Sequence, residues 1–229
     1  MREWLSLCSY LITLRFHPIP AYVVEIVDSL VFYLGLPSGG RAYVLIDASG
    51  FKIAGDRKWK SKVYGPSYHR KRVKAHIVDD STTNEIIDLI VTDLTQTNVT
   101  VGQELLKRLP GNVRRLLASS AFDFCLQAYE QGVKALNPPP SNARTKEGVQ
   151  LEDRNGALRT IKGIGGGKGA RSLWRKFTGY CHLVKPESAF SRLKCLFGEI
   201  VFLRDNTAQL VEIWYETLLS NQWLNIGCK

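Results

Sequence analysis

The stretch V-L-I-D-A-S-G-F-K, residues 44–52, places an aspartate directly after a run of apolar residues and directly before a small, glycine-bearing segment. Residues 42–47 are almost wholly apolar, which is typical of a strand that is covered on both faces of a sheet. The small residues after Asp47 indicate a turn. The sequence therefore predicts a buried strand that ends at Asp47 and presents its carboxylate at the strand end.

The segments that follow predict a mixed α/β sheet. Residues 73–79 and 85–92 are predicted as two strands of a hairpin, separated by the polar cluster D-D-S-T-T-N. After them we expect a helix, a buried strand, a helix that stops at Gly132 and a short strand, at residues 102–109, 113–118, 122–131 and 133–136. Because parallel strands need crossover helices, the second half should be βαβ-like.

Residues 141–179 are rich in Gly, Arg, Lys and Ser, and we expect an inserted loop region here. Its G-I-G-G-G-K-G segment has no strand before it and no Ser or Thr after Lys168, so the features of a nucleotide-binding loop are missing. The alternative is a mobile basic loop that follows a phosphodiester backbone. Trp174, in the middle of this region, either stacks on a base or anchors the loop to the core.

The best-signalled helix is predicted at residues 186–198, P-E-S-A-F-S-R-L-K-C-L-F-G. Pro186 fits the first helical position and Gly198 fits the C-terminal stop. At about 100° per residue, the apolar side chains fall on one arc, whereas Glu187, Ser191 and Lys194 fall on the opposite side. This polar side is either an ordinary solvent-facing surface or a functional face that carries an acid and an amine.

The chain carries an excess of positive charge, with 31 Lys and Arg against 21 Asp and Glu in 229 residues. The excess falls mainly in residues 52–74, 107–115 and 154–176, which suits a phosphate backbone; a solvated basic surface is the alternative. Five cysteines without a C-x-x-C pair indicate neither a disulfide framework nor a zinc site, and His76 is expected to be packed or close to DNA rather than a metal ligand. No apolar stretch predicts a membrane span, so we expect a soluble cytoplasmic protein.

Three segments, in this order, carry a family resemblance: I-D-A-S-G-F-K-I-A-G-D-R-K-W-K, R-K-R-V-K-A-H-I-V-D and D-L-T-Q-T-N-V. They resemble the catalytic core of bacterial insertion-sequence transposases of the DDE type, in the group typed by insertion sequences four and five. In that family the first strand ends in D-S-T-G-x-K, which Asp47, Ser49, Gly50 and Lys52 match, with Ala48 in place of a serine.

The resemblance runs from about residue 40 to the C-terminus. Its later part consists of D-R-N-G-A-L-R, W-R-K-F-T-G-Y ending at Tyr180, and Glu187 followed by Arg192 and Lys194. It implies an RNase H-like domain over residues 41–229, with a mixed sheet flanked by helices and the basic Gly-rich insertion at about 141–179 before the last helices.

The resemblance also implies a function and a set of site residues. In the family, three carboxylates hold two Mg²⁺ (or Mn²⁺) ions for phosphoryl transfer at transposon ends, and Asp47 and Glu187 match two of these acids. Lys52, Tyr180 and Lys194 are then expected to contact double-stranded DNA. We expect the basic side chains of the insertion to bind DNA as well: Arg171, Arg175 and Lys176. Family members work as homodimers, so we expect a homodimer. The resemblance also implies a bacterial protein in the cytoplasm that is associated with the nucleoid.

Several positions depart from the family pattern. The family's fourth strand runs into D-G-A-Y-D, whereas this chain has S-S-A-F-D, so that Ser119 occupies the position of the middle metal-binding aspartate. Asp123 lies one helical turn further on and is a poor replacement, since the family already has an Asp there. Leu183 stands where the family has a phosphate-binding arginine, and Val101 where it has an acid. Residues 1–40 are expected to be a short helical remnant of a longer DNA-recognition region.

Three interpretations of function remain. The first is a DDE transposase that cuts and joins DNA, impaired or inactive in this copy because the middle acid is Ser119. The second is a relic or domesticated transposase that keeps the fold and binds DNA without chemistry. The third is an RNase H-like nuclease unrelated to transposition, which leaves the pattern from Tyr180 to Lys194 unexplained.

Overall fold

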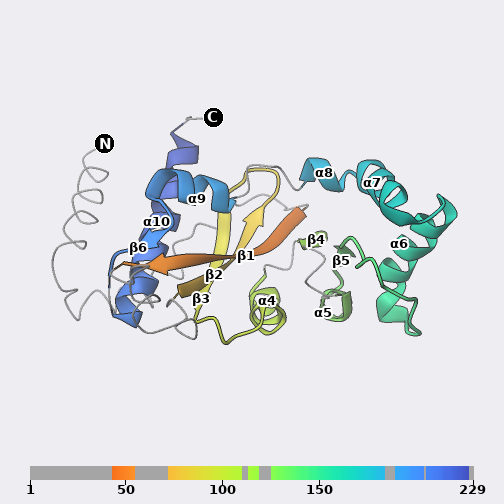
Figure 1. Ribbon diagram of the computed structural model, residues 1–229, viewed down its shortest axis with the longest axis horizontal. Helices are drawn as coiled ribbons and strands as arrows, with labels where there is room; N and C mark the ends of the chain where they lie inside the picture. The colour runs from red at the N-terminus through yellow and green to blue at the C-terminus, as the bar shows by residue number, and fades with distance from the viewer. Residues whose placement is uncertain are drawn as a thin grey trace, which may run out of the picture.

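The computed structural model describes residues 43–54, 72–109, 113–118, 125–183, 189–203 and 205–226. Within these residues, helices flank a six-stranded mixed sheet (Figure 1). The strands are β1 (Tyr43–Ile53), β2 (Arg72–Asp80), β3 (Ile86–Thr92), β4 (Arg115–Ala118), β5 (Lys134–Leu136) and β6 (Ile200–Val201). The helices are α4 (Asn98–Lys107), α5 (Cys125–Glu130), α6 (Glu152–Gly163), α7 (Gly167–Phe177), α8 (Tyr180–Leu183), α9 (Ala189–Phe197) and α10 (Asn206–Asn225).

The sheet has the order β3-β2-β1-β4-β5, and β6 pairs with β1 outside this path. Strands β1, β2 and β3 pair antiparallel, whereas β4, β5 and β6 join in parallel. The predicted succession of three strands, helix, strand, helix and strand is confirmed, as is the mixed sheet of an RNase H-like α/β fold. The predicted remnant at residues 1–40 lies outside the described residues.

The predicted end of the first strand at Asp47 is wrong, because β1 continues to Ile53. Its A-S-G segment lies in extended conformation and pairs with β2, Ala48 with His76 and Gly50 with Lys74. Weak strand formers adopt this conformation because a continuous antiparallel register with β2 holds them from Val44 to Lys52. Asp47 therefore lies within a long strand and not at its tip.

Alternation along β1 divides its side chains between two cores. Val44 and Ile46 face α4 and α5, together with Val78, Leu105 and Leu106. The opposite face of the sheet is covered by α9 and α10 (Figure 1), where a second cluster contains Phe51, Ala75, Ile77, Phe190, Leu193 and Ile213. Asp47 pairs with Ile77 and therefore belongs to the face under α9 and α10.

Residues 141–179 are not the loop region that their composition suggests. Two helices, α6 and α7, occupy most of this segment and lie at the end of the molecule beyond β5 (Figure 1). Ala157, Ile161, Ala170 and Trp174 form a small core of their own, packed against Leu136. Gly165 and Gly166 in the tight turn between the helices, and Gly167 at the start of α7, adopt positive φ. Trp174 is buried, so it anchors this segment, as the second interpretation of this residue proposes.

The late helix predicted at residues 186–198 is described from Ala189 as α9. Ala189, Phe190 and Leu193 are buried on the predicted apolar arc. Arg192 fastens α9 in place, since it donates to Ser220 Oγ of α10 (2.7 Å) and to the carbonyl of Asn84 in the β2–β3 turn (2.8 Å). α9 is thereby held on the sheet face that carries Asp47.

Helix α10, which no sequence pattern predicts, spans 20 residues and is buried along most of its length. Asp205 caps its N-terminus by accepting from the N–H groups of Thr207 and Ala208. The buried carboxylate of Glu212 accepts from the N–H groups of Phe202 and Leu203, which follow β6. None of the helices in the described part of the chain is long and apolar enough to cross a membrane.

Candidate active site

Asp47 lies on the edge of β1 that pairs with β4 before it and with β6 after it. Strand β4 pairs with β1 only as far as Ile46, opposite Ala118, and β6 pairs only from Lys52. Within the described residues, no strand pairs with this edge between these two points. The N–H of Lys52 points to this edge, because it donates to the carbonyl of Glu199. The N–H of Ala48 points the same way, because Ala48 lies four residues before Lys52 and alternate N–H groups of a strand share one edge. The Ala48 N–H donates to Asp47 Oδ1 at 2.8 Å.

The Asp47 carboxylate lies within the electrostatic influence of Lys194 on α9. The side chain is half-buried, and this burial raises the pKa of Asp47. The Ala48 N–H and the charge of Lys194 on α9 oppose the rise in this pKa. Asp47 thus has one oxygen bonded to the backbone, and no hydrogen bond to its Oδ2 is found among the described residues.

A second acid on this face, Asp79, was not predicted as a site residue. In the β1–β2 register Asp79 is opposite Leu45, so it lies diagonally across from Asp47 on the same sheet face. Asp79 is only 4% exposed, and no hydrogen-bond partner for its Oδ1 is found in the described part of the chain. Burial, followed by the charge of Asp47, raises the pKa of Asp79 to about 7.

The signal for Asp79 is present in the sequence. Every second residue of β2 points into the core under α9 and α10, namely Val73, Ala75 and Ile77. Asp79 is the next residue of this series and therefore points the same way. The D-D pair at residues 79–80 is also typical of a turn, but β2 continues to Asp80 and the side chain of Asp79 points into the core.

Tyr180, a predicted DNA contact, lies mostly inside the molecule. Its hydroxyl donates to the carbonyl of Ala118 at 3.0 Å, and its ring packs with Leu45 and Leu117. Ala118 is the last residue of β4, directly before Ser119. Tyr180 therefore fixes the end of β4 beside Asp47, and a contact of this residue with DNA stays a prediction.

The two predicted DNA-binding lysines converge on one carboxylate. Lys52 Nζ lies 2.7 Å from Glu199 Oε2, and Lys194 Nζ lies 3.9 Å from Glu199 Oε1. The Lys194 ammonium also lies 5.5 Å from the centre of the Phe51 ring. Glu199 was not predicted as a site residue, because its place between the lysines depends on the pairing of β6 with β1.

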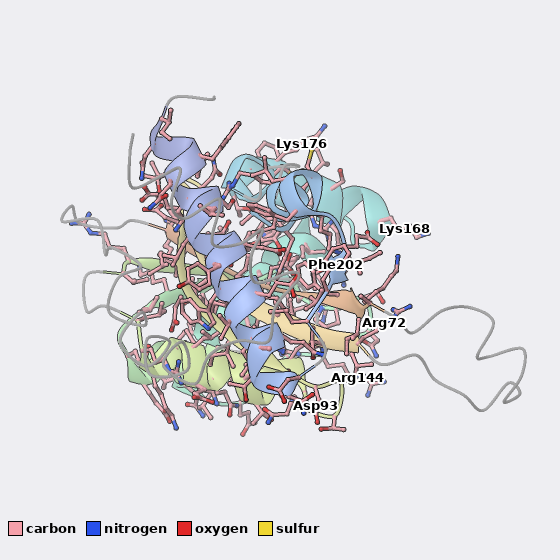
Figure 2. All side chains as sticks on the ribbon, turned by 90° about the vertical axis from the view of Figure 1, so that its left-hand side faces the viewer. Arg72, Asp93, Arg144, Lys168, Lys176 and Phe202 are labelled. Carbon is pink, nitrogen blue, oxygen red and sulfur yellow. The ribbon has the colours of Figure 1, made fainter. Side chains whose placement is uncertain are left out.

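The three basic residues predicted on the insertion all belong to α7. Arg171 donates to the carbonyls of Pro139, Pro140 and Ser141, and so ties α7 to the segment after β5. Arg175 and Lys176 are exposed, and Figure 2 shows Lys176 directed away from the body of the molecule. Two of the three cations are thus available to a partner at the surface, while Arg171 also has a structural role.

Ser119, Asp123 and Glu187 lie outside the described residues, so the predicted triad is seen in part. Ala118, the residue before Ser119, pairs with Ile46, the residue before Asp47. Ala189, two residues after Glu187, packs in the same cluster as Ile77, the partner of Asp47. Among the described residues no three His, Cys, Asp or Glu side chains gather in a way that could hold a metal ion. Of the three acids that the family pattern requires, this part of the chain supplies Asp47.

His76, one of the four histidines, is fully buried in β2 between Ala48 and Ile90. Its Nε2 lies 3.1 Å from Thr92 Oγ1, and burial lowers the pKa of His76 to about 4. His76 is therefore a neutral, packed residue, which is one of the two roles expected for it.

A comparison with known protein families agrees with this arrangement. The family model described as "Transposase DDE domain" matches residues 38–219, which is most of the chain. The matched range contains the whole mixed sheet, Asp47, Tyr180 and Lys194, together with Ser119 and Glu187. This chain belongs to the transposase DDE domain family.

Proposed function

We propose that the chain is the catalytic core of a DDE transposase of the insertion sequence four and five group, and that it acts on double-stranded DNA at transposon ends. Family membership supports a role in transposition. The excess of Lys and Arg supports a polyanionic partner. The protein would act as a homodimer that pairs two DNA ends, in the bacterial cytoplasm and in association with the nucleoid.

The observation that carries this proposal is the setting of Asp47. Ile46, the residue before Asp47, pairs with Ala118 of β4, and α9 covers the same sheet face as Asp47. Residue 119 follows Ala118, which pairs with Ile46, and residue 187 stands two positions before Ala189, which packs in the same cluster as Ile77, the partner of Asp47. This arrangement supports a single site that draws on three distant parts of the chain.

A divalent metal fits Asp47 by its chemistry, because carboxylate oxygens are the preferred ligands of Mg²⁺ and Asp47 Oδ2 accepts no hydrogen bond from the described residues. When bound, two such ions activate a water or 3′-hydroxyl and stabilise the leaving oxygen of a phosphodiester. We propose Asp47 and Glu187 as the metal-holding acids. Tyr180 holds the end of β4 in position, and Lys52 and Lys194 bind DNA phosphates.

The copy is proposed to be impaired or inactive. Three carboxylates bring three negative charges to two Mg²⁺ ions, whereas Ser119 is neutral and leaves only two. Leu183 removes the bidentate phosphate contact of an arginine. The loss of one acid therefore weakens metal binding, and the loss of the arginine weakens the hold on DNA.

The alternative function is a non-catalytic DNA-binding relic or a domesticated transposase. What favours it is the same serine at position 119. The two functions differ in one respect only, which is whether DNA is cleaved.

The test is a nicking assay on supercoiled DNA and on transposon-end duplexes, with Mg²⁺ and with Mn²⁺. We expect little or no nicking by the wild type, nicking by Ser119→Asp, and loss of that nicking when Asp47→Ala is added. Asp93→Ala removes an exposed acid that follows β3, which β2 separates from β1, and serves as the matched control (Figure 2).

The binding of DNA is measured in parallel by mobility shift over a range of salt concentrations. A salt-sensitive shift without nicking in any variant supports the relic. Strong nicking by the wild type contradicts the role assigned to Ser119, and the absence of any shift contradicts both functions.

A further inference from the structure

Lys52, Lys194 and Glu199 form a compact charge cluster at the point where β6 joins β1. The two ammonium groups approach opposite oxygens of the same carboxylate, at 2.7 Å for Lys52 and 3.9 Å for Lys194. The three side chains come from three elements: Lys52 from β1, Lys194 from α9, and Glu199 from the turn that leads into β6.

The backbone fixes the carboxylate between the lysines. Gly198 ends α9 with φ at 90°, a conformation that favours glycine, and turns the chain toward β1. The N–H of Lys52 then donates to the carbonyl of Glu199 at 2.8 Å, and Ile200 pairs with Lys52 in the sheet. Glu199 is thus tied to the same residue whose side chain it binds.

The cluster is accessible and stays charged. The side chains of Lys52 and Glu199 are 47% and 50% exposed, and that of Lys194 is 25% exposed. The hydrogen bond and charge of Lys52, followed by the charge of Lys194, lower the pKa of Glu199, and Arg72 acts in the same direction. At neutral pH one carboxylate therefore faces two ammonium groups and a nearby guanidinium, so the cluster keeps a net positive charge.

A phosphodiester can make the same contacts with ammonium groups as a carboxylate does. Its two non-bridging oxygens share one negative charge, as the two oxygens of a carboxylate do. We propose that Glu199 occupies the position of a DNA phosphate between Lys52 and Lys194, and competes with DNA for this pair of lysines. The proposal rests on the DNA-binding function and adds to it a phosphate subsite with a built-in competitor. Because exposed ion pairs are weak, DNA phosphate can displace the Glu199 side chain and the subsite opens on binding.

The competitor also affects the site at Asp47. The charge of Lys194 acts on the Asp47 carboxylate, and Glu199 draws the same ammonium toward the part of β1 that pairs with β6. A phosphate that takes the place of Glu199 would bring DNA to β1. Along this strand Asp47 and Lys52 lie about 16 Å apart at the usual rise per residue.

The test is Glu199→Gln, which keeps the shape of the side chain and removes its charge. Affinity for a fluorescent double-stranded DNA is measured by anisotropy at several KCl concentrations. We expect Glu199→Gln to bind on the order of 2- to 5-fold more tightly at 0.1 M KCl, in line with the weakness of an exposed ion pair. The slope of log affinity against log salt should steepen by up to about 0.9, which corresponds to one more neutralised phosphate.

The matched control is Glu104→Gln on α4. Glu104 also pairs with a cation, Arg108, and has a similar exposed fraction of 54%, but α4 covers the opposite face of the sheet (Figure 1). Both variants change the net charge equally, so a purely long-range effect gives equal gains. In the Lys52→Met/Lys194→Met background, Glu199→Gln should give no gain beyond that of Glu104→Gln.

Equal affinities of Glu199→Gln and Glu104→Gln, or weaker binding by Glu199→Gln, would overturn the inference. In that event, salt-sensitive binding by the wild type leaves the proposed function intact. If neither the wild type nor Glu199→Gln binds DNA, the proposed function and the inference both fail. Thermal melts of each variant establish that the fold is retained.

Discussion

Replacement of Asp79 by asparagine should stabilise the protein in a pH-dependent manner. Burial and the neighbouring Asp47 carboxylate raise the pKa of Asp79 from 3.8 to about 7 in the folded state, whereas the charge of Arg192 opposes the rise. The native state therefore binds more protons than the unfolded state between about pH 4 and pH 7, and the free energy of unfolding falls as the pH rises through this range. At 1.36 kcal/mol per pH unit, the ionised carboxylate costs up to about 4 kcal/mol at pH 8.

An asparagine has the shape of the protonated acid and cannot ionise. Asp79→Asn should therefore unfold with a free energy close to that of the wild type near pH 4, and exceed it by several kcal/mol, up to about 4 kcal/mol, at pH 8. The measurement is urea denaturation followed by tryptophan fluorescence at pH 4, 5, 6, 7 and 8.

The control for Asp79→Asn is Asp93→Asn at the surface. Hydrogen bonds from Thr95 lower the pKa of Asp93, so its ionised form favours the folded state and the difference between variant and wild type should have the opposite sign. A difference between Asp79→Asn and the wild type that does not change with pH, or an Asp79→Asn variant that is less stable at pH 8, would refute the assignment of Asp79 as a buried acid with a raised pKa.

Three other substitutions test how the site is supported. Tyr180→Phe removes the hydrogen bond to the Ala118 carbonyl and should lower the free energy of unfolding by about 1 kcal/mol in urea titrations; no change would mean that this bond does not hold the end of β4. Arg192→Met removes the donors to Ser220 and Asn84 and should cost about 2 kcal/mol, with faster hydrogen exchange in α9; unchanged exchange would contradict the anchoring of α9 by this residue. Trp174→Ala should cost about 3 kcal/mol and increase hydrogen exchange mainly in α6 and α7, whereas an unaffected exchange pattern there would favour the loop that the composition suggests.

The alternation of apolar residues predicts the sheet well, but it does not predict where β1 ends. Residues 48–50 are small and have little strand preference, and their extended conformation results from pairing with β2, which a local pattern does not contain. In the same way, α10 shows no one-sided apolar pattern, because it is buried on most of its circumference.

The error at residues 141–179 has a different cause. The abundance of Gly, Arg and Lys indicated a loop, although Ala157 and Ile161 in α6, and Ala170 and Trp174 in α7, have the i, i+4 spacing of a buried helix face. This core is so small that its signal is weaker than that of the overall composition.

The sequence predicts only those site residues that belong to a recognisable motif. Asp47 and Lys194 follow from a family pattern, and the structure brings both to one sheet face. Asp79 and Glu199 match no motif, because their roles arise from strand register and from the turn before β6. Residues whose function depends on tertiary neighbours are the ones that sequence patterns do not reveal.

The most direct test of a shared acidic site is a crystal structure of the chain grown with Mn²⁺ and a short DNA duplex, with anomalous scattering used to locate the metal. We predict a metal peak bonded to Asp47 at about 2.2 Å, with the carboxylates of Asp47 and Glu187 within about 8 Å of each other and the hydroxyl of Ser119 beside them. Carboxylates of Asp47 and Glu187 on opposite sides of the molecule, or metal bound only elsewhere, would contradict the account.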